Sequence, residues 1–263
     1  MAATRSEATL AIRSGKVTVS GRPAAKAGML VLPEEPIAVA GPTRKFVSRA
    51  GEKLEAALDR FGIDVTGRHA LDAGASTGGF TDCLLFRGAA HVVAVDVGYG
   101  QLDWRLREDD RVTVLDRTNV RDLEPSDLPF APEVITADLS FISLRLFLPA
   151  LVRCSAPAST FLLLVKPQFE AGRGETVEGV VTEPAVWRRV LDSVAKAGAA
   201  GGLRVTGVMA SPLMGPAGNV EFLLAAEARP DHGDAPEQLT TPLDRAIDRA
   251  IDEATTMVSA RHG

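Results

Sequence analysis

Short apolar runs alternate with segments of helical periodicity along most of this chain. Five of these runs have the length and composition of buried strands, and helical segments separate them. They are residues 69–73, 91–95, 112–115, 133–137 and 160–165. Two further runs, 203–210 and 219–227, predict a final strand pair after a helix at 185–200. The alternation predicts an α/β fold with a mainly parallel seven-stranded sheet and helices on both faces.

The two ends of the chain show shorter elements. The N-terminal part predicts a helix at 4–14, a turn at 20–23 and short strands at 16–19, 29–31 and 37–39. At the other end, apolar residues from Leu243 to Ala254 recur at the spacing of an amphipathic helix. The predicted units are a small α+β module (1–40), a linker (41–45), a main domain (46–228) with its first helix at 46–61, a second linker (229–242) and a C-terminal helix (243–263).

A glycine-rich turn follows the first strand of the main domain. Gly74 and Gly78 lack a Cβ, so the backbone there can take a positive φ and a ligand can approach it, while the helix start adds free amides. The spacing matches neither G-x-G-x-x-G nor a phosphate-binding loop with its lysine, which argues against a dinucleotide or a nucleoside triphosphate. A purely architectural turn is the alternative. The candidate cofactor residues here are Asp72, Gly74, Ser76, Thr77, Gly78, Gly79 and Phe80.

Two later strand ends add candidate ligand contacts. Asp96 follows the second strand about 20 residues after the glycines, where a carboxylate can accept both hydroxyls of a ribose. Val97 lies next to it. Asn119 follows the third strand, and polar groups at a strand's carboxyl end are placed for adenine recognition. The alternative for Asp96 is an aspartate that only caps a turn.

Four charged residues suggest a reaction centre. Asp138 and Lys166 follow the fourth and fifth strands, and the carboxyl ends of parallel strands share one rim of a sheet. We therefore expect both near a nucleotide bound at the glycine turn. Lys53 on the first helix and Glu221 in the last strand complete a set of two positive and two negative groups that can neutralise one another in a cleft. An ion-pair network without chemistry is the alternative.

The composition limits the class of protein. The chain has 263 residues, 46% of them apolar, enough for one core and a small appendage. Its longest apolar runs are far shorter than the roughly 20 residues that span a bilayer, and the N-terminus has no apolar signal core. Cys83 and Cys154 form no disulfide framework, and the four histidines lack zinc-ligand spacing. We expect a soluble cytoplasmic protein that holds no metal.

The charge is distributed unevenly. The net charge is −5, but residues 1–53 hold nine basic and four acidic residues and so carry +5. The rest of the chain has 20 basic and 30 acidic residues, a charge of −10. A basic appendage on an acidic body is typical of an anion-binding module, although a solvated basic face is the alternative. The candidate RNA contacts are Arg5, Arg13, Lys16, Arg22, Arg44, Lys45 and Arg49.

Several of these motifs occur together in one known family. The chain resembles the TlyA family, the haemolysin A-type proteins, which are similar to FtsJ-like RNA 2′-O-ribose methyltransferases and carry an S-four-like RNA-binding module. The matching segments are residues 46–54, 72–82, 95–102, 137–143, 166–169, 211–213 and 218–222. The resemblance implies a Rossmann-like methyltransferase sheet, S-adenosylmethionine as methyl donor, and a catalytic tetrad formed by Lys53, Asp138, Lys166 and Glu221.

The resemblance also implies a substrate and a mechanism. The expected reaction is methyl transfer to the 2′-hydroxyl of a cytidine in 16S or 23S ribosomal RNA, with ribosomal RNA or subunits as partners. Lys166, as a neutral amine, is the candidate general base, while Asp138 and Glu221 orient the lysines. The family's N-terminal module usually opens with a further helix, whereas this chain starts within what resembles the second helix, which bears on RNA affinity. The sequence does not determine an oligomeric state.

Other functions are weighed against this one. A small-molecule O-methyltransferase would keep the glycine turn and could adapt the tetrad, and methyl incorporation into ribosomal RNA would separate the two. A non-catalytic RNA-binding factor would not need all four charged residues, and a membrane-lytic protein would need a spanning or cationic amphipathic segment. Phe141, Phe169 and Trp104 could stack on a splayed nucleotide, but we expect core packing for each.

Overall fold

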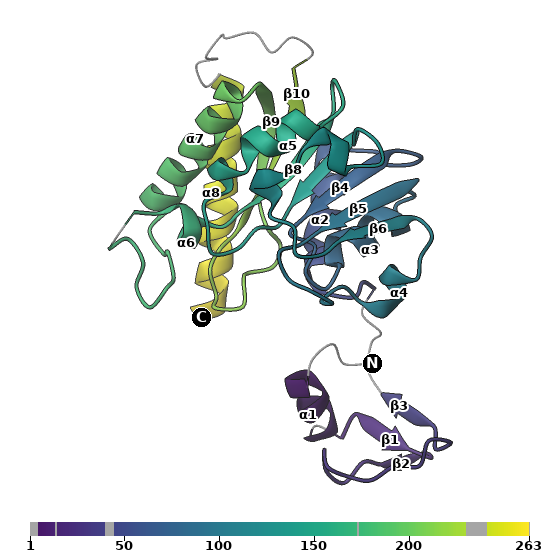
Figure 1. Cartoon of the computed structure of the whole chain (residues 1–263). Helices are drawn as coiled ribbons and strands as arrows, with labels where there is room; N and C mark the ends of the chain where they lie inside the picture. The colour runs from purple at the N-terminus through teal and green to yellow at the C-terminus, as the bar shows by residue number, and fades with distance from the viewer. Residues whose placement is uncertain (1–4, 14, 40–44, 173, 230–240, 263) are drawn as a thin grey trace.

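A seven-stranded sheet is the centre of the molecule (Figure 1). The computed structural model describes residues 5–13, 15–39, 45–172, 174–229 and 241–262. The strand order is β6-β5-β4-β7-β8-β10-β9. The strands are β4 (His69–Ala73), β5 (His91–Val95), β6 (Val112–Leu115), β7 (Val134–Ala137), β8 (Thr160–Val165), β9 (Leu203–Ala210) and β10 (Phe222–Ala228). The predicted mainly parallel sheet is confirmed.

The order in which the chain adds strands to the sheet reverses between β4 and β7. From β4 the chain goes to β5 and β6 on one side and later returns to β7 and β8 on the other, and all of these neighbours pair in parallel. Only β10 runs antiparallel to both its neighbours, β8 and β9. In open α/β sheets, ligands bind outside the carboxyl ends of the strands next to such a switch point. The fold therefore selects the carboxyl edge at β4 and β7.

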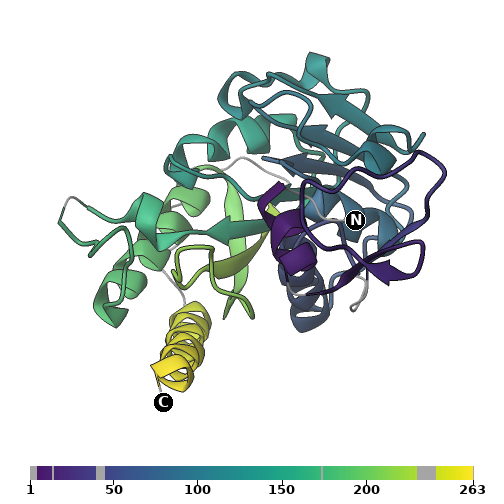
Figure 2. The same cartoon turned by 90° about the horizontal axis from the view of Figure 1, so that it is seen from below.

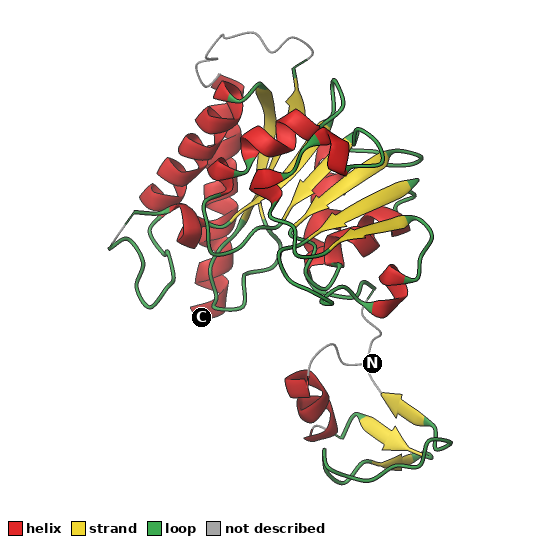
Figure 3. Ribbon diagram, viewed as in Figure 1, coloured by secondary structure: helices red, strands yellow, loops and turns green. Residues whose placement is uncertain are grey.

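Helices cover both faces of the sheet (Figures 2 and 3). On one face, α2 (Ala50–Phe61) and α3 (Gly79–Phe86) bury Leu54, Leu58 and Phe80 against alternate residues of the strands. On the other face, α5 (Leu148–Cys154) and α7 (Pro184–Ala200) pack into a second core that contains Trp187. Strands buried on both faces explain the continuous apolar runs in the sequence.

The C-terminal helix, α8 (Thr241–His262), packs on the edge strand β9 and beside α7 (Figure 1). Its residues Leu243, Ile247 and Ala254 join the core, and Arg60 of α2 pairs with Glu253 at 2.9 Å. A covered edge cannot pair with another chain, so this helix protects the sheet. The predicted amphipathic helix is present, although it begins at Thr241 rather than 243.

The N-terminal residues form a separate small sheet with one helix. It contains α1 (Arg5–Arg13), β1 (Val17–Val19), β2 (Arg22–Pro23) and β3 (Ile37–Val39), with strand order β2-β1-β3. The predicted strand at 29–31 is wrong. Met29 N–H donates to the Lys26 carbonyl in a turn, and the Leu30 side chain is 97% exposed. Val31 packs against the small core of Val17, Val19 and Ala24, but the stretch has no ladder partner.

Two predicted elements begin later than expected because their first residues make other bonds. The helix expected from residue 46 begins at Ala50, since Val47 N–H donates to Asp82 Oδ2 on α3 at 2.8 Å. The strand expected from residue 219 begins at Phe222. There the Asn219 side chain accepts from Val181 N–H and donates to the Gly179 carbonyl, both at 2.9 Å, so it ties two loops together.

Candidate functional site

The glycine turn between β4 and α3 is tightly enclosed by its neighbours. Gly74 has a φ of 82°, and a Cβ at this position would lie 2.7 Å from the backbone oxygen of Asp138. Gly78 has a φ of 95°, and its Cβ would collide with Leu106 of α4 (Trp104–Arg107). Both positions need glycine because of backbone conformation and space together. The turn therefore touches Asp138 directly.

Asp72 supports the turn from below. Its Oδ2 accepts hydrogen bonds from Thr81 N–H at 2.9 Å and Thr81 Oγ1 at 2.7 Å, and Thr136 Oγ1 lies 3.3 Å from Oδ1. Burial raises the pKa of Asp72 from its ordinary value of 3.8 to about 7, although the bonds from Thr81 act in the opposite direction. The side chain is fully buried, so Asp72 braces the turn.

The remaining turn residues differ in what they offer a ligand. Ser76 is exposed, and Thr77 uses its carbonyl to accept from Asp103 N–H at 3.2 Å. Gly79 and Phe80 begin α3, where the first backbone amides of a helix lack partners within the helix. The Phe80 ring lies in the core. Only its backbone is therefore available to a ligand.

Asp96 closes the other side of the turn. Its two carboxylate oxygens accept from Ser76 N–H at 2.8 Å and from Gly98 N–H at 2.7 Å. Each oxygen keeps a lone pair, so the carboxylate can still accept two hydroxyls. Val97 beside it is exposed. Asn119 is exposed and accepts from Arg121 N–H at 3.1 Å, which caps a short helix.

The four predicted charged residues form two ion pairs. Lys53 Nζ donates to Glu221, and their side chains are only 8% and 2% exposed. Lys166 Nζ lies 2.5 Å from Asp138 Oδ1 and donates to Ser140 Oγ at 2.7 Å, and here the lysine and aspartate are 11% and 20% exposed. Apart from this ion pair, the buried Asp138 Oδ1 has no hydrogen-bond partner among the described residues, so it can still accept one.

Strand register brings the two pairs to one edge. Phe222 pairs with Val165 in antiparallel register, so Glu221 and Lys166 occupy the next rung. Asp138 N–H donates to the Ala73 carbonyl at 3.0 Å, which connects the same edge to the glycine turn. The structure therefore places the expected cofactor residues and the four charged residues along one continuous edge.

Two of the predicted aromatic side chains are exposed, and one of them, Phe141, directly follows Ser140, the hydrogen-bond partner of Lys166. The Phe141 side chain is 91% exposed with a φ of 70°, and its ring centroid lies 5.4 Å from that of Phe169, which is half-buried. Trp104 is exposed as well, because Leu106 is the residue of α4 that packs inward. The expectation of core packing is wrong for Phe141 and Trp104: both lie in loops or helix ends beyond the strands.

The candidate RNA contacts fall into two groups. Arg13, Lys16 and Arg22 are exposed on the small N-terminal sheet. Lys45 pairs with Glu55 at 2.5 Å, and Arg49 donates to the Met214 carbonyl at 2.7 Å, so both help to hold the main body together. The side chain of Arg5 and all of Arg44 lie outside the described residues.

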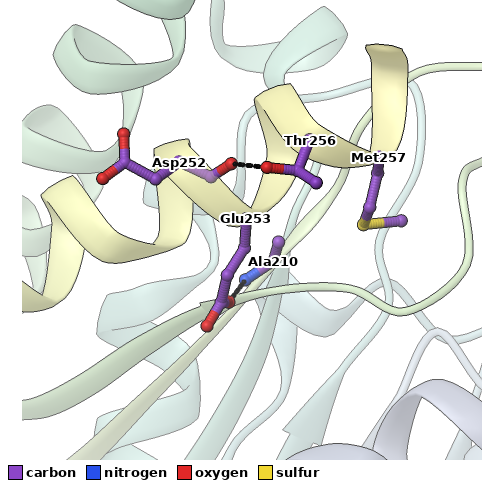
Figure 4. A pocket seen from close by; sticks show the side chains of 5 residues that line it. All are labelled: Ala210, Asp252, Glu253, Thr256 and Met257. Carbon is purple, nitrogen blue, oxygen red and sulfur yellow. Dashed lines mark hydrogen bonds between the residues drawn. The ribbon is translucent and has the colours of Figure 1, made fainter. Parts of the chain in front are cut away.

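A further hollow borders the same edge, because Ala210 in its lining pairs with Phe222, in the rung next to Glu221. This open hollow lies between the end of β9 and α8 (Figure 4). It is lined by Ala210, Asp252, Glu253, Thr256 and Met257.

None of the helices in the described part of the chain combines the length and apolar character that crossing a bilayer requires. The same residues contain no cluster of three or more potential metal ligands.

Sequence reasoning missed the residues that hold the site in place. Thr81 and Thr136 bind Asp72, and Ser140 accepts from Lys166. Glu170 accepts from Ser143 Oγ at 2.7 Å and anchors the loop after β7. Only one signal was available in the sequence: Glu170 lies four residues after Lys166, the spacing of one helical turn.

The comparisons with known proteins agree with this geometry. A family model described as FtsJ-like methyltransferase matches residues 46–228. The 16S/23S rRNA (cytidine-2′-O)-methyltransferase TlyA of Mycobacterium tuberculosis is 47% identical over 249 residues, which cover 94% of this chain and 93% of the relative. A solved structure of a proposed hemolysin from Streptococcus thermophilus is 37% identical, with a TM-score of 0.77 over 98% of this chain and 94% of that one.

A more distant structure shows how general the fold is. A proposed S-adenosylmethionine-dependent methyltransferase from Listeria monocytogenes superimposes with a TM-score of 0.50 at 16% identity, covering 69% of this chain and all of that one. The residues of the site, the family model and the close relative all point the same way. This chain is a methyltransferase that belongs to the FtsJ-like methyltransferases and, within them, to the TlyA family.

Proposed function

We propose that this protein transfers a methyl group from S-adenosylmethionine to the 2′-hydroxyl of a cytidine in ribosomal RNA. The observation that carries the proposal is the pair of lysine–carboxylate contacts, Lys53 with Glu221 and Lys166 with Asp138, at the sheet edge next to the glycine turn. The 47% identity to a 16S/23S rRNA methyltransferase supports the substrate class. In the cytoplasm the protein would meet ribosomal RNA or ribosomal subunits.

The residues at this edge fit the chemistry of the methyl donor. The backbone of the glycine turn would hold the methionine portion, with Asp138 Oδ1 able to accept a hydrogen bond from it. Asp96 would accept from the ribose hydroxyls, while Val97 and Asn119 would border the adenine. When bound, S-adenosylmethionine supplies an electrophilic methyl group on a sulfonium.

Lys166 is the proposed general base. Its Nζ, as a neutral amine, would take the proton from the 2′-hydroxyl as the oxygen attacks and would become an ammonium. The O–CH₃ bond would form as the sulfur–methyl bond of the donor breaks, with a neutral thioether as the leaving group. Asp138, 2.5 Å away, would stabilise that ammonium, and Ser140 would fix its direction. Lys53 and Glu221 would hold the adjoining rung of the edge in place. Much of the acceleration would come from this alignment.

RNA would be held by two surfaces. The exposed Phe141 ring, backed by Phe169, suits stacking on the base of a splayed nucleotide next to Lys166. The N-terminal module (1–40) would bind phosphates through exposed cations such as Arg13, Lys16 and Arg22. Lys45 and Arg49 lie in the sequence where this module is followed by the catalytic domain (46–228), and there they would add positive charge for RNA.

The direct test follows labelled methyl groups from the donor to their acceptor. Purified protein is incubated with methyl-labelled S-adenosylmethionine and with intact ribosomal subunits, free rRNA transcripts or a catechol as a small-molecule acceptor. The proposal expects 2′-O-methylcytidine in the nuclease digest of RNA or subunits and no labelled catechol. Label on a base, on catechol alone or on none of the acceptors contradicts it.

A further inference from the structure

Glu170 is a buried carboxylate beside the proposed reaction centre that the mechanism above does not use. It ends the short helix α6 (Pro167–Glu170), which begins directly after Lys166. Its side chain is only 3% exposed. Burial of a carboxylate costs free energy unless hydrogen bonds and ion pairs replace the lost water. The partners of Glu170 therefore indicate which part of the structure it stabilises.

Among the described residues, the side-chain partners of Glu170 all lie in the segment that follows β7. Oε1 accepts from Leu144 N–H at 2.5 Å. Oε2 accepts from Ser143 Oγ at 2.7 Å and from Arg145 Nε at 3.1 Å. Arg145 in turn donates to Ser193 Oγ on α7 at 2.9 Å. Three consecutive residues of the loop are thus tied to one carboxylate.

The other end of the same loop is tied to Lys166. The lysine contacts Asp138 and Ser140, while Glu170 holds Ser143 and Leu144. Between these two anchors lies Phe141, which has a left-handed backbone and a ring centroid 5.4 Å from that of Phe169. A strained, exposed residue keeps such a conformation only where the surrounding structure determines it. The loop is clamped on both sides of Phe141.

We propose that Glu170 is a positioning residue for methyl transfer: it clamps the loop after β7 so that the Phe141 ring is held beside Lys166 for the target nucleotide. This inference rests on the proposed function. Glu170 itself touches neither donor nor acceptor. Its carboxylate acts through Leu144 and Ser143 on the backbone that carries Phe141.

Substitution of Glu170 by glutamine tests the clamp. Glutamine keeps the size but has one acceptor oxygen in place of two and no charge, so kcat on the RNA substrate should fall about 10- to 100-fold. The dissociation constant for S-adenosylmethionine should change less than about 2-fold. Glu175→Gln is the matched control, because Glu175 is a nearby carboxylate that pairs with Arg189 at the surface. A wild-type kcat for E170Q overturns the proposal.

A double-mutant cycle separates positioning of Phe141 from a general structural role. If Glu170 acts through Phe141, E170Q should lower kcat by less than about 2-fold in the Phe141→Ala background. Equal losses in both backgrounds overturn the proposal. Ser143→Ala, which removes a single bond to Glu170, provides a milder variant with an expected loss of about 3- to 10-fold if E170Q does not fold.

A measurement without RNA keeps the inference distinct from the proposed function. Hydrogen exchange of the amides at 139–146 should be at least about 10-fold faster in E170Q than in the wild type, and unchanged in E175Q. If the wild-type protein methylates no RNA, the proposed function fails while this exchange still reports on the clamp. Unchanged exchange in E170Q contradicts the clamp whatever the activity is.

Discussion

The two lysine–carboxylate pairs have the same chemistry but different surroundings. Lys53 and Glu221 are 8% and 2% exposed, and a Cβ on Gly215 would lie 2.6 Å from Glu221 Oε1, so the loop before β10 encloses this inner pair. The outer pair, Lys166 and Asp138, is 11% and 20% exposed and continues into Ser140 and the loop that carries Phe141. One pair is enclosed by packing and the other opens toward solvent.

This difference separates a structural contribution from a chemical one. A buried ion pair contributes little net stability, yet the loss of one partner is costly because the other charge stays buried and unpaired. A partly open pair costs less to break, since water can replace the lost partner. We therefore expect the inner pair to hold the edge together and the outer pair to carry the proton transfer.

The largest effect should come from Lys166→Ala. Loss of the proposed base should lower the rate of methyl transfer to RNA by about 1,000-fold or more, while S-adenosylmethionine still binds. Single-turnover kinetics and calorimetric titration of the cofactor measure the two quantities. Lys196→Ala, on the outer part of α7, serves as the control. Turnover close to that of the wild type would show that Lys166 is not the base. The outer pair would then have no chemical role that separates it from the inner pair.

The next effect should be on stability, and it should distinguish the pairs. Glu221→Gln leaves Lys53 buried without a charged partner, so the free energy of unfolding should fall by about 3 kcal/mol. Asp138→Asn should cost only about 1 kcal/mol, because the outer pair is partly solvated. Urea denaturation at neutral pH provides both values. Equal losses would show that the exposure of the pairs does not set their contribution.

The last effect is spread over several pH units and concerns the buried carboxylate of Asp72. Burial raises the pKa of Asp72 to about 7, and the charge of Asp138 raises it further. Because the folded-state pKa lies above the unfolded value of 3.8, the folded protein binds more protons between these pH values. The contribution of Asp72 to stability is fully present below the unfolded value and is lost as the pH rises toward 7.

Asp72→Asn isolates that contribution. The difference in unfolding free energy between wild type and variant should change by up to about 1.4 kcal/mol per pH unit within this window and level off above it. Asp138→Asn, which removes the neighbouring charge, should shift the window to lower pH. A difference that does not depend on pH would mean that Asp72 titrates as an ordinary surface carboxylate.

Much of the fold follows from the sequence because strands buried on both faces leave continuous apolar runs. The runs at 69–73, 91–95 and 160–165 coincide with β4, β5 and β8. Prediction fails where the local pattern has no tertiary partner. Residues 29–31 have strand-like side chains but no neighbouring strand. The helical pattern starts at residue 46, but α2 begins only at Ala50 because Val47 N–H donates to Asp82 on α3.

Part of the site could be predicted because ligand-binding and catalytic residues of open α/β sheets lie at the carboxyl ends of strands. Asp96, Asp138 and Lys166 were selected for that reason, and the topology places each at the carboxyl edge. The partners were not predictable. Nothing local indicates that Lys53 pairs with Glu221 across 168 residues, or that Phe141 points into solvent.

The sequence alone determined the order of strands and helices, the glycine turn and the set of residues able to carry the chemistry. Apolar periodicity and backbone conformational freedom are local properties that a chain displays before it folds. The tertiary structure decided which charges meet, how much water reaches each pair and which loop is clamped beside Lys166. Those depend on strand register and burial, and both arise from contacts between residues far apart in the chain.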